Sequence, residues 1–387
     1  MAIGFEIPLW VRPVLAAPEL LAVQSSIGLH SHGLDTLAAN LAPGSLGPKS
    51  FDGHGRDSRG GNGRSGDGAS ELYAPVKQQT YWQAKRDAVI ELTKPNITKM
   101  VVLTSGVGFV LAIFGSAANW WAIAVSAFGC ILGTSLSASG ANALNQWWER
   151  KRDRLMHRTA TRPLPSLRLH SGTGFLVGMA CSVFGVGVLL VLCGVAAAVV
   201  SASTILIYVL IYTPMKTRSP LATLVGAVPG ALPPLIGWSA GSVLAGATGF
   251  APLMQWGGWS LFALMFMWQI PHFLAIAWMY KDDYARGGHA VLPVFDPTGK
   301  ATAWTVVIGA VLLIPTVLLP MFAMSDRLGF ISGAVAGAVT LAFLVACTPM
   351  LRETTRATAR RAFLGSILQL PVVLMAFVAE VVIRMVV

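Results

Sequence analysis

The chain has 387 residues, of which 54% are hydrophobic and only 12% are charged, and its formal net charge is +11. Soluble domains carry roughly 25% charged residues, so this composition excludes an ordinary soluble domain and indicates an integral membrane protein. Lys and Arg stand at the ends of apolar runs, and no basic soluble module is visible, so we expect no nucleic-acid partner.

Residues 1–80 differ from the rest of the chain and are predicted to form a disordered amino-terminal tail. The centre of this segment, SFDGHGRDSRGGNGRSGDGAS at Ser50–Ser70, is rich in Gly, Ser and charge and offers almost nothing to bury. The first residues lack a basic region and are interrupted by Glu6, Pro13 and Glu19, which argues against a cleaved signal peptide. Few arginines and several acids also argue against a mitochondrial presequence.

Residues 81–387 are predicted to form one transmembrane domain, because apolar spans of about 20 residues recur along them. The class we predict is an all-α, polytopic integral membrane protein with about nine transmembrane helices. The predicted spans are Met100–Ala118, Trp120–Gln146, Gly174–Leu192, Gly194–Tyr212, Leu221–Ser239, Gly257–Tyr280, Thr302–Phe322, Gly329–Cys347 and Ala362–Ile383.

The cations predict the orientation of these spans. If the amino end is inside, every inside segment carries Lys or Arg, whereas the outside segments hold only Arg327 and Arg384. Such asymmetry is typical of the positive-inside rule. We therefore expect a bacterial cytoplasmic (inner) membrane protein with its charged loops in the cytoplasm, and the mitochondrial inner membrane is the weaker alternative.

The second predicted span ends in NALNQWWERKRDRLMHRTATRPLPS, at Asn142–Ser166. Asn145, Glu149 and Asp153 are spaced i, i+4 and i+8, so they share one face as long as the helix persists. Carboxylate and amide oxygens are ligands that suit Mg²⁺, which takes one or two carboxylates and leaves its other positions to water and phosphate. The spacing predicts a metal-binding face.

A basic stripe lies beside this face. Arg150, Arg154 and Arg158 also repeat every four residues, and arginines suit phosphate oxygens. In the alternative interpretation, these arginines only set the orientation of the span and the nearby acids balance them.

The sixth predicted span ends in a similar way, in YKDDYARGGHAVLPV at Tyr280–Val294. Asp282 and Asp283 stand between Lys281 and Arg286. Both acidic groups lie on the same predicted side of the membrane, so together they are able to hold a metal-bridged diphosphate.

Two further segments are candidates for the same site. Lys216 and Arg218 precede a helix rich in Gly and Pro, which predicts either a cavity wall or a kinked helix between neighbours. His272 lies within the sixth span, in WQIPHF, about three helical turns from Asp283. A histidine inside a membrane helix is a functional candidate, and the alternative is a structural histidine bonded to a backbone carbonyl.

These stretches together resemble the UbiA superfamily of intramembrane prenyltransferases and, within it, the branch that farnesylates haem b. The resemblance spans Glu91–Val294 and is carried by ELTKPNITKM, NQWWERKRDRLMHRTATRPLPS, YTPMKTRSP, GAVPGALPPLIGW, WQIPHF and YKDDYARGGHAVLPV. It implies a bundle of nine helices around a central cavity, with Mg²⁺ as cofactor between two acidic motifs.

The resemblance also implies roles for individual residues, although Glu149 stands where the first motif usually has Asp. The implied catalytic residues are Asn145, Glu149, Asp153, Asp283 and His272. The implied metal ligands are Asn145, Glu149, Asp153, Asp282 and Asp283. The cations expected at the diphosphate are Arg150, Arg154, Arg158, Lys216 and Lys281. Arg162 and Arg218 are the candidates for the haem propionates, and His272 for the iron or a proton.

The implied reaction joins the farnesyl group of farnesyl diphosphate to a vinyl group of haem b, giving haem O and diphosphate for haem–copper oxidase biogenesis. Haem A synthase or oxidase assembly factors are the implied protein partners. One alternative is a related prenyltransferase that acts on a quinone precursor, another aromatic acceptor or a chlorin. The other is a secondary transporter, which would place ionisable groups near the bilayer midplane.

Overall fold

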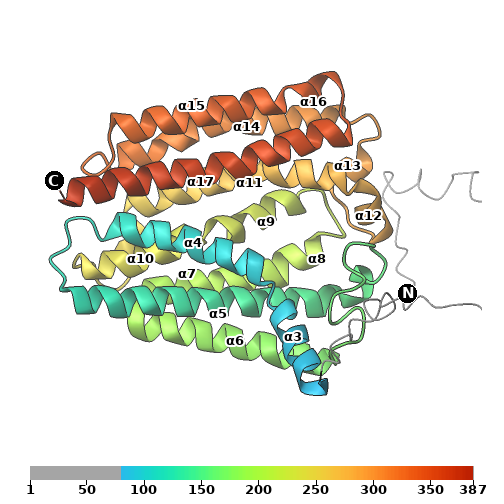
Figure 1. The fold of residues 1–387 in the computed structure, drawn as a ribbon, viewed down its shortest axis with the longest axis horizontal. Helices are drawn as coiled ribbons and strands as arrows, with labels where there is room; N and C mark the ends of the chain where they lie inside the picture. The colour runs from blue at the N-terminus through green and yellow to red at the C-terminus, as the bar shows by residue number, and fades with distance from the viewer. Residues whose placement is uncertain (1–79, 387) are drawn as a thin grey trace, which may run out of the picture. The chain divides into compact units, whose positions relative to one another are not determined.

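The computed structural model describes residues 80–386, and the predicted tail lies outside them apart from its last residue. Within the described residues every regular element is a helix, and nine helical segments are long and apolar enough to cross a bilayer (Figure 1). The prediction of an all-α membrane domain with nine spans is confirmed. The spans are Pro95–Ala112, Trp120–Asp153, Ser171–Cys193, Val195–Met215, Ala222–Leu244, Trp256–Met279, Lys300–Ala323, Phe330–Arg352 and Arg356–Met385.

Five of these spans are single helices: α4 (Pro95–Ala112), α5 (Trp120–Asp153), α6 (Ser171–Cys193), α11 (Trp256–Met279) and α14 (Lys300–Ala323). A further one lies within α17 (Arg356–Val386). The other three are composite: α7 (Val195–Leu206), η2 (Ile207–Tyr212) and α8 (Thr213–Met215); α9 (Ala222–Ala231) and α10 (Pro233–Leu244); α15 (Phe330–Cys347) and α16 (Pro349–Arg352). The remaining short elements are α3 (Tyr81–Leu92), η3 (Ala251–Met254), α12 (Lys281–Arg286) and α13 (Leu292–Phe295).

Most boundaries differ from the sequence prediction by one to seven residues, and two of these differences are explained by local sequence. α4 ends at Ala112 rather than Ala118, because Gly115 adopts a φ of 72°, which is left-handed backbone that a right-handed helix does not contain. α5 continues to Asp153 rather than stopping at Gln146, because Glu, Arg and Lys are strong helix formers even though they are not apolar. The second difference matters for function, since it keeps the acidic residues on regular helix.

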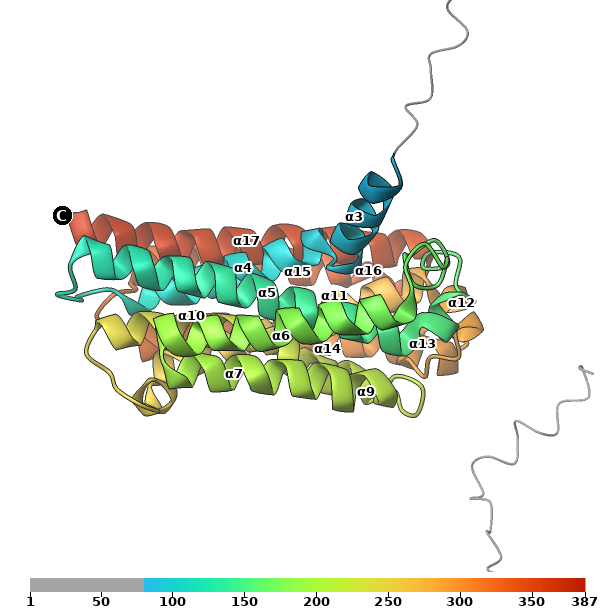
Figure 2. The same cartoon turned by 90° about the horizontal axis from the view of Figure 1, so that it is seen from below.

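The long helices lie side by side in two groups (Figures 1 and 2). In one group α5 packs against α6 and α4, and α4 packs against α10; in the other α11 packs against α14 and α17, and α15 against α17. α11 joins the groups, because it also contacts α9 and α10. The short elements α8, α12 and α13 lie at the same end of the bundle as the carboxyl end of α5 (Figure 1).

Helices α4 and α10 approach each other through two glycines. A Cβ atom on Gly237 would lie 1.7 Å from the carbonyl oxygen of Ser105, and one on Gly108 would lie 2.0 Å from that of Pro234. Lipid tails are as apolar as the helix surface, so the hydrophobic effect does not drive membrane helices together. Close packing does so instead, and small residues at the contact allow it. The α4–α10 contact therefore depends on the absence of side chains at both positions.

We expect Gly237→Ala to destabilise the protein, because α4 and α10 must separate to admit the methyl group. Overpacking of this kind costs about 1–3 kcal/mol or more. Thermal unfolding of the purified protein in detergent measures the loss as a lower Tm. Gly106→Ala on α4 is the matched control, because a Cβ there has no neighbour within 4 Å. Equal Tm values for the two variants would contradict the assigned packing.

Candidate functional site

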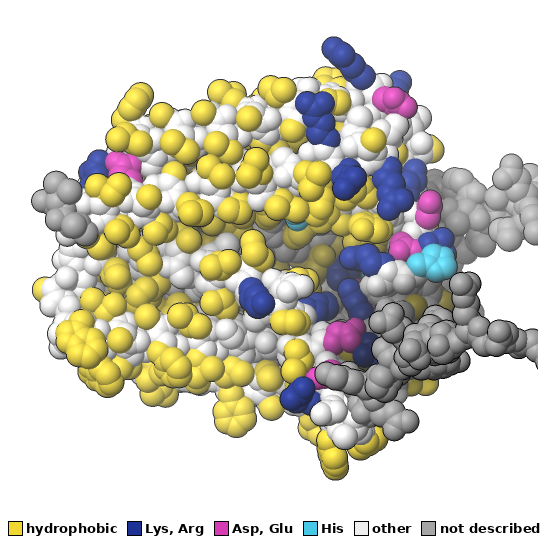
Figure 3. Space-filling model, in the orientation of Figure 1, with side chains coloured by type: hydrophobic (Ala, Val, Ile, Leu, Met, Phe, Trp, Pro, Cys, Tyr) yellow, Lys and Arg dark blue, Asp and Glu magenta, His cyan; other side chains and the backbone are white. Residues whose placement is uncertain are grey.

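A cavity of ≈ 240 Å³ lies at the end of the bundle where α5 ends, and we call it the charged cavity. It is lined by Lys94, Ile97, Asn145, Glu149, Asp153, Met156, Arg158, Thr159, Arg162, Tyr208, Tyr212, Lys216, Ala222, Thr223, Phe273, Ile276, Ala277, Tyr284, His289 and Val291. Figure 3 shows Lys and Arg side chains gathered toward this end of the molecule, next to a hollow between α17 and α4. The lining combines carboxylates, cations and an apolar wall.

The acidic face of α5 forms part of the cavity wall. Asn145, Glu149 and Asp153 all line the cavity and are 1%, 5% and 1% exposed. Their spacing of four residues places them on one side of α5, and the helix is unbroken as far as Asp153. The structure thus brings together the three residues that the sequence assigned to the first acidic motif.

Asn145 is the centre of a hydrogen-bond network within this wall. Its Nδ2 atom donates to Glu149 Oε2 at 3.0 Å and to Thr213 Oγ1 at 2.9 Å. Its Oδ1 atom accepts a hydrogen bond from Lys94 Nζ at 3.2 Å. Asn145 therefore connects α5 with the segment before α4 and with α8.

Each buried carboxylate of α5 is paired with a cation from another segment. Lys216 Nζ lies 3.0 Å from Glu149 Oε1, and Arg162 Nη1 donates to Asp153 Oδ2 at 2.9 Å. Burial disfavours the Lys216 cation, but the charge of Glu149 outweighs this effect and holds the pKa of Lys216 above its ordinary value. Burial, together with the nearby Arg162 and Lys216 cations, lowers the pKa of Lys94 to about 7.

The second acidic pair is placed differently. Asp282 is exposed, whereas the buried Asp283 accepts hydrogen bonds from the backbone N–H groups of His157 and Arg158, each at 3.3 Å, and from the Arg286 guanidinium. Burial alone would raise the pKa of Asp283, but these hydrogen bonds outweigh it and hold the pKa below its usual range. Neither acid lines the charged cavity, and their metal-ligand role stays a prediction.

Two of the five predicted diphosphate cations line the charged cavity, Arg158 and Lys216. The Arg158 guanidinium also lies over the ring of Tyr280, 5.2 Å from its centroid. The other three cations donate to backbone carbonyl oxygens near them: Arg150 to Trp147 at 2.6 Å, Arg154 to Pro165 at 3.0 Å and Lys281 to Asp296 at 3.1 Å.

The candidates for haem binding are also separated. Arg162 lines the charged cavity, where it pairs with Asp153, whereas Arg218 is exposed and lies outside the lining. His272 is half-buried on α11, and its Nδ1 atom lies 2.7 Å from the hydroxyl of Ser366 on α17. Of these three candidates, Arg162 is the one that lines the charged cavity.

Lys94 and His289 are among the lining residues that were not predicted as site residues from the sequence. Lys94 immediately precedes α4 with a φ of 49°, a rare conformation for a residue with a side chain. In the sequence it lies within ELTKPNITKM, directly before Pro95, the first residue of the helix. His289 is buried, its Nδ1 atom has no hydrogen-bond partner among the described residues, and burial lowers its pKa, which favours the neutral ring.

Two tyrosines reach the cavity from a π-helical segment, η2. Tyr208 and Tyr212 have ring centroids 5.4 Å apart, and Lys216 Nζ lies 4.5 Å from the Tyr212 centroid. π-helical turns are rare and are often found at functional sites. Tyr208, Tyr212 and Lys216 are spaced four residues apart, and this spacing in the sequence could have indicated that the two tyrosines share a face with Lys216.

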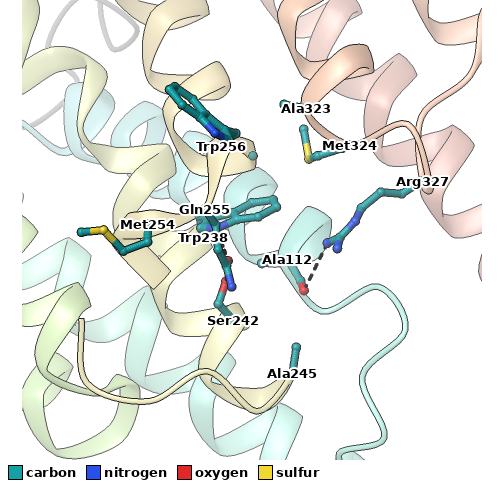
Figure 4. Close-up of a pocket in the computed structure, with 11 residues that line it drawn as sticks. Ala112, Trp238, Ser242, Ala245, Met254, Gln255, Trp256, Ala323, Met324 and Arg327 are labelled. Carbon is teal, nitrogen blue, oxygen red and sulfur yellow. Dashed lines mark hydrogen bonds between the residues drawn. The ribbon is translucent and has the colours of Figure 1, made fainter. Parts of the chain in front are cut away.

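A second cavity, of ≈ 370 Å³, is lined by Ala112, Trp238, Ser242, Ala245, Met254, Gln255, Trp256, Gly257, Ala323, Met324 and Arg327 (Figure 4). Its polar groups bond to one another: Trp238 Nε1 and Ser242 Oγ both donate to Gln255 Oε1 at 2.7 Å. Arg327 donates to the carbonyl of Leu111 at 2.7 Å, near the end of α4. This lining includes no carboxylate, so the charged cavity is the better candidate for chemistry.

The oxygen atoms of the charged cavity suit a Mg²⁺ ion. Within residues 80–386 no three His, Cys, Asp or Glu side chains are arranged to hold a metal. Mg²⁺ needs fewer protein ligands, because it commonly keeps one or two carboxylates and completes its shell with water and substrate phosphate. Glu149 Oε1 is buried and lies 3.0 Å from the Lys216 ammonium, so a metal ion bound there would share this oxygen with Lys216.

Comparison with known proteins gives one consistent family. Residues 101–368 match the UbiA prenyltransferase family. The chain is 42% identical over 290 residues to a protoheme IX farnesyltransferase of Solibacter usitatus, covering 73% of this chain and 95% of that protein. The fold is similar to the structure of a digeranylgeranylglyceryl phosphate synthase, with a TM-score of 0.62, 16% identity and coverage of 77% and 98% of the two chains. It is also similar to a UbiA homologue from Archaeoglobus fulgidus bound to GPP and Mg²⁺, with a TM-score of 0.52, 16% identity and coverage of 76% and 99%.

We expect Asp283→Ala to release the loop that follows α5. The backbone N–H groups of His157 and Arg158 lose a charged acceptor, and such hydrogen bonds are worth about 1.5–3 kcal/mol each. Hydrogen–deuterium exchange of the peptide covering residues 154–166 should therefore become roughly tenfold faster or more. Asp282→Ala is the matched control, because Asp282 is exposed. Equal exchange in both variants would contradict this role of Asp283.

Proposed function

The chain belongs to the UbiA prenyltransferase family, and we propose that it transfers the farnesyl group of farnesyl diphosphate to a vinyl group of haem b, giving haem O and diphosphate. Relatives named protoheme IX farnesyltransferase support the choice of substrates. The observation that carries the proposal is the charged cavity, where an acidic helix face meets cations and an apolar wall. A diphosphate with an apolar tail needs this combination.

The charge of the cavity favours an anionic ligand. Two carboxylates, Glu149 and Asp153, face three cations in the lining, Arg158, Arg162 and Lys216, and Lys94, whose pKa of about 7 leaves it only partly charged. Lys216 and Arg162 hold the two carboxylates, which leaves Arg158 as the cation least committed to an acid. Lys and Arg donors lower the energy of negative charge as it develops on a leaving diphosphate.

Mg²⁺ is the cofactor that the donor set suits, with Asn145, Glu149 and Asp153 as the residues that would hold it. When bound, the ion offsets charge on the diphosphate oxygens and so eases breakage of the allylic C–O bond. The burial of these three oxygen-bearing side chains on one face of α5 supports this assignment. Asp282 and Asp283 stay predicted ligands.

The remaining wall suits the farnesyl group. Tyr208, Tyr212, Phe273 and Ile276 present aromatic and aliphatic surface next to the carboxylates. Such surface excludes water from an allylic cation, and aromatic faces attract a cation electrostatically. The electron pair of the C–O bond leaves with diphosphate, the haem vinyl group forms the new C–C bond to farnesyl, and a water molecule adds to the adjacent carbon and loses a proton.

The orientation we propose places the charged cavity on the cytoplasmic side. The chain is an integral membrane protein whose relatives are bacterial. The cavity opens at the end of the bundle where Lys and Arg gather, and cytoplasmic ends of membrane proteins are enriched in these residues. A water-soluble diphosphate head would then enter from the cytoplasm while its tail lies in the bilayer.

The purified protein supplied with farnesyl diphosphate, haem b and Mg²⁺ is expected to form haem O, detected by liquid chromatography with mass spectrometry. The same protein given 4-hydroxybenzoate in place of haem b is expected to form no prenylated product. This pair of reactions separates the proposal from a related prenyltransferase that acts on aromatic acceptors. Prenylated aromatic product without haem O would show that the acceptor is wrong.

Asp153→Asn and Glu149→Gln are each expected to lower kcat/KM for haem O formation by about 100-fold or more, because metal-assisted departure of the leaving group is worth several kcal/mol. EDTA should abolish wild-type activity and added Mg²⁺ should restore it. Asp87→Asn is the control, because Asp87 pairs with Arg86 on α3 and does not line the charged cavity. Full activity in both cavity variants would refute the assignment of these carboxylates.

A further inference from the structure

The second cavity, of ≈ 370 Å³, lies at the opposite end of the bundle from the charged cavity. α11 shows this directly, because Trp256 at its start lines the second cavity, whereas Ile276 near its end lines the charged cavity. Other walls come from α4, α10 and the loop between α14 and α15 (Figure 4). Both groups of helices therefore contribute to this cavity, which the proposed reaction does not use.

Arg327, in the loop between α14 and α15, is the one charged side chain of this lining. Its Nη1 atom donates to the carbonyl of Leu111 at 2.7 Å, and its Nε atom lies 3.0 Å from a carboxylate oxygen of the exposed Asp326, outside the lining. The guanidinium lies 5.4 Å from the centroid of Trp238, toward which it points in Figure 4. Its Nη2 atom has no hydrogen-bond partner among residues 80–386, so it is a charged donor left for a ligand.

Gln255 supplies a second unpaired donor. Its Oε1 atom accepts from Trp238 Nε1 and from Ser242 Oγ, each at 2.7 Å. An indole N–H can only donate, so this contact fixes which end of the amide is the oxygen. Nε2 therefore carries two N–H groups, and within the described residues it has no hydrogen-bond partner. The lining side chains thus offer unpaired donors and no carboxylate, which favours a ligand with anionic oxygens.

The amino end of α11 adds to the positive potential of the cavity. Gln255 precedes this helix, but its side chain makes no capping hydrogen bond, and Gly257 in the first turn lines the cavity. The N–H groups of a first turn favour nearby negative charge. A Cβ atom on Gly257 would overlap the indole of Trp238, so the missing side chain allows the first turn to lie against this wall.

We infer that the second cavity binds the phosphate group of an anionic membrane lipid. Its mouth carries apolar side chains, since Met254 and Trp256 are each 78% exposed. Trp120 and Trp121 are also exposed at this end of the bundle, where α5 begins. Tryptophans concentrate at the membrane–water interface, which places the cavity at the level of the lipid headgroups. A phosphodiester at this level presents its oxygens to the cavity while its acyl chains stay in the bilayer.

The lining selects an anionic headgroup over a zwitterionic one. It contains no carboxylate to accept the ammonium group of a zwitterionic lipid, and Arg327 repels that group. The face of Trp238 that would otherwise attract an ammonium is already next to the Arg327 guanidinium. A bound lipid would contact α4 and α10 in one group of helices and α11 in the other, so binding should stabilise the folded bundle.

Native mass spectrometry of the full chain in detergent, with dioleoylphosphatidylglycerol as the probe, tests the site. We expect one lipid to bind more tightly than the rest. Gln255→Glu keeps the acceptor of Trp238 and Ser242 but replaces Nε2 with an anionic oxygen, so it should weaken binding of this lipid by about tenfold or more. Loss of affinity in this variant with wild-type Tm would support the inference, and unchanged affinity would overturn it.

Arg384→Gln is the matched control, because it lowers the net charge by one, as Gln255→Glu does. Arg384 lies next to Gly329 of the loop that carries Arg327, but it pairs with Glu380 and does not line the cavity. The affinity for the tightly bound lipid should stay at the wild-type value. Equal losses in the two variants would overturn the inference, because the lipid would then respond to net charge alone.

Thermal unfolding of the wild-type protein provides a second measurement in case Gln255→Glu does not fold. Dioleoylphosphatidylglycerol should raise the Tm more than dioleoylphosphatidylcholine does, because a ligand of the folded state stabilises it in proportion to its affinity. Inorganic phosphate at the same concentration should leave the Tm unchanged, since it lacks the acyl chains that hold a lipid at the mouth. Equal stabilisation by the two lipids, or stabilisation by inorganic phosphate alone, would overturn the assignment to an anionic lipid.

Discussion

The charged cavity depends on the pairing of two buried carboxylates on α5 with cations from other segments. Glu149 pairs with Lys216, which follows α8, and Asp153 pairs with Arg162, from the loop after α5. A buried charge is tolerated only when it is paired and hydrogen-bonded. Because each partner comes from a separate part of the chain, packing of these segments onto α5 and neutralisation of the acids occur together. The same two ion pairs therefore form part of the wall of the site and hold this end of the bundle together.

Hydropathy and charge were sufficient to predict most of the fold. A bilayer accepts only segments that satisfy their own backbone hydrogen bonds, so apolar length translates directly into helices, and nine were predicted and found. The boundaries were less predictable, because hydropathy measures where apolar residues stop rather than where the helix stops. α5 shows the difference, since it continues through charged residues to Asp153 and holds the predicted acidic face in register.

The candidate site was only partly predictable. Periodicity identified Asn145, Glu149 and Asp153, because spacing along a regular helix determines which side chains share a face. It did not indicate that Asp283 would bond to backbone N–H groups from a loop more than a hundred residues away, since such contacts depend on tertiary packing. Periodicity also did not distinguish the cations that line the cavity from those that donate to nearby backbone carbonyls. A long Arg or Lys side chain at a helix end can turn either way, and only local acceptors decide which.

The π-helical segment η2 divides one membrane span into two registers. A π turn contains more residues than an α turn, so the side chains beyond η2 are rotated relative to the pattern of α7. The residues of α7 thus meet lipid and neighbouring helices in one phase, while Tyr212 and Lys216 meet the cavity in another. The side chains of α7 and those that face the cavity beyond η2 therefore follow different helical phases, although both belong to one membrane span.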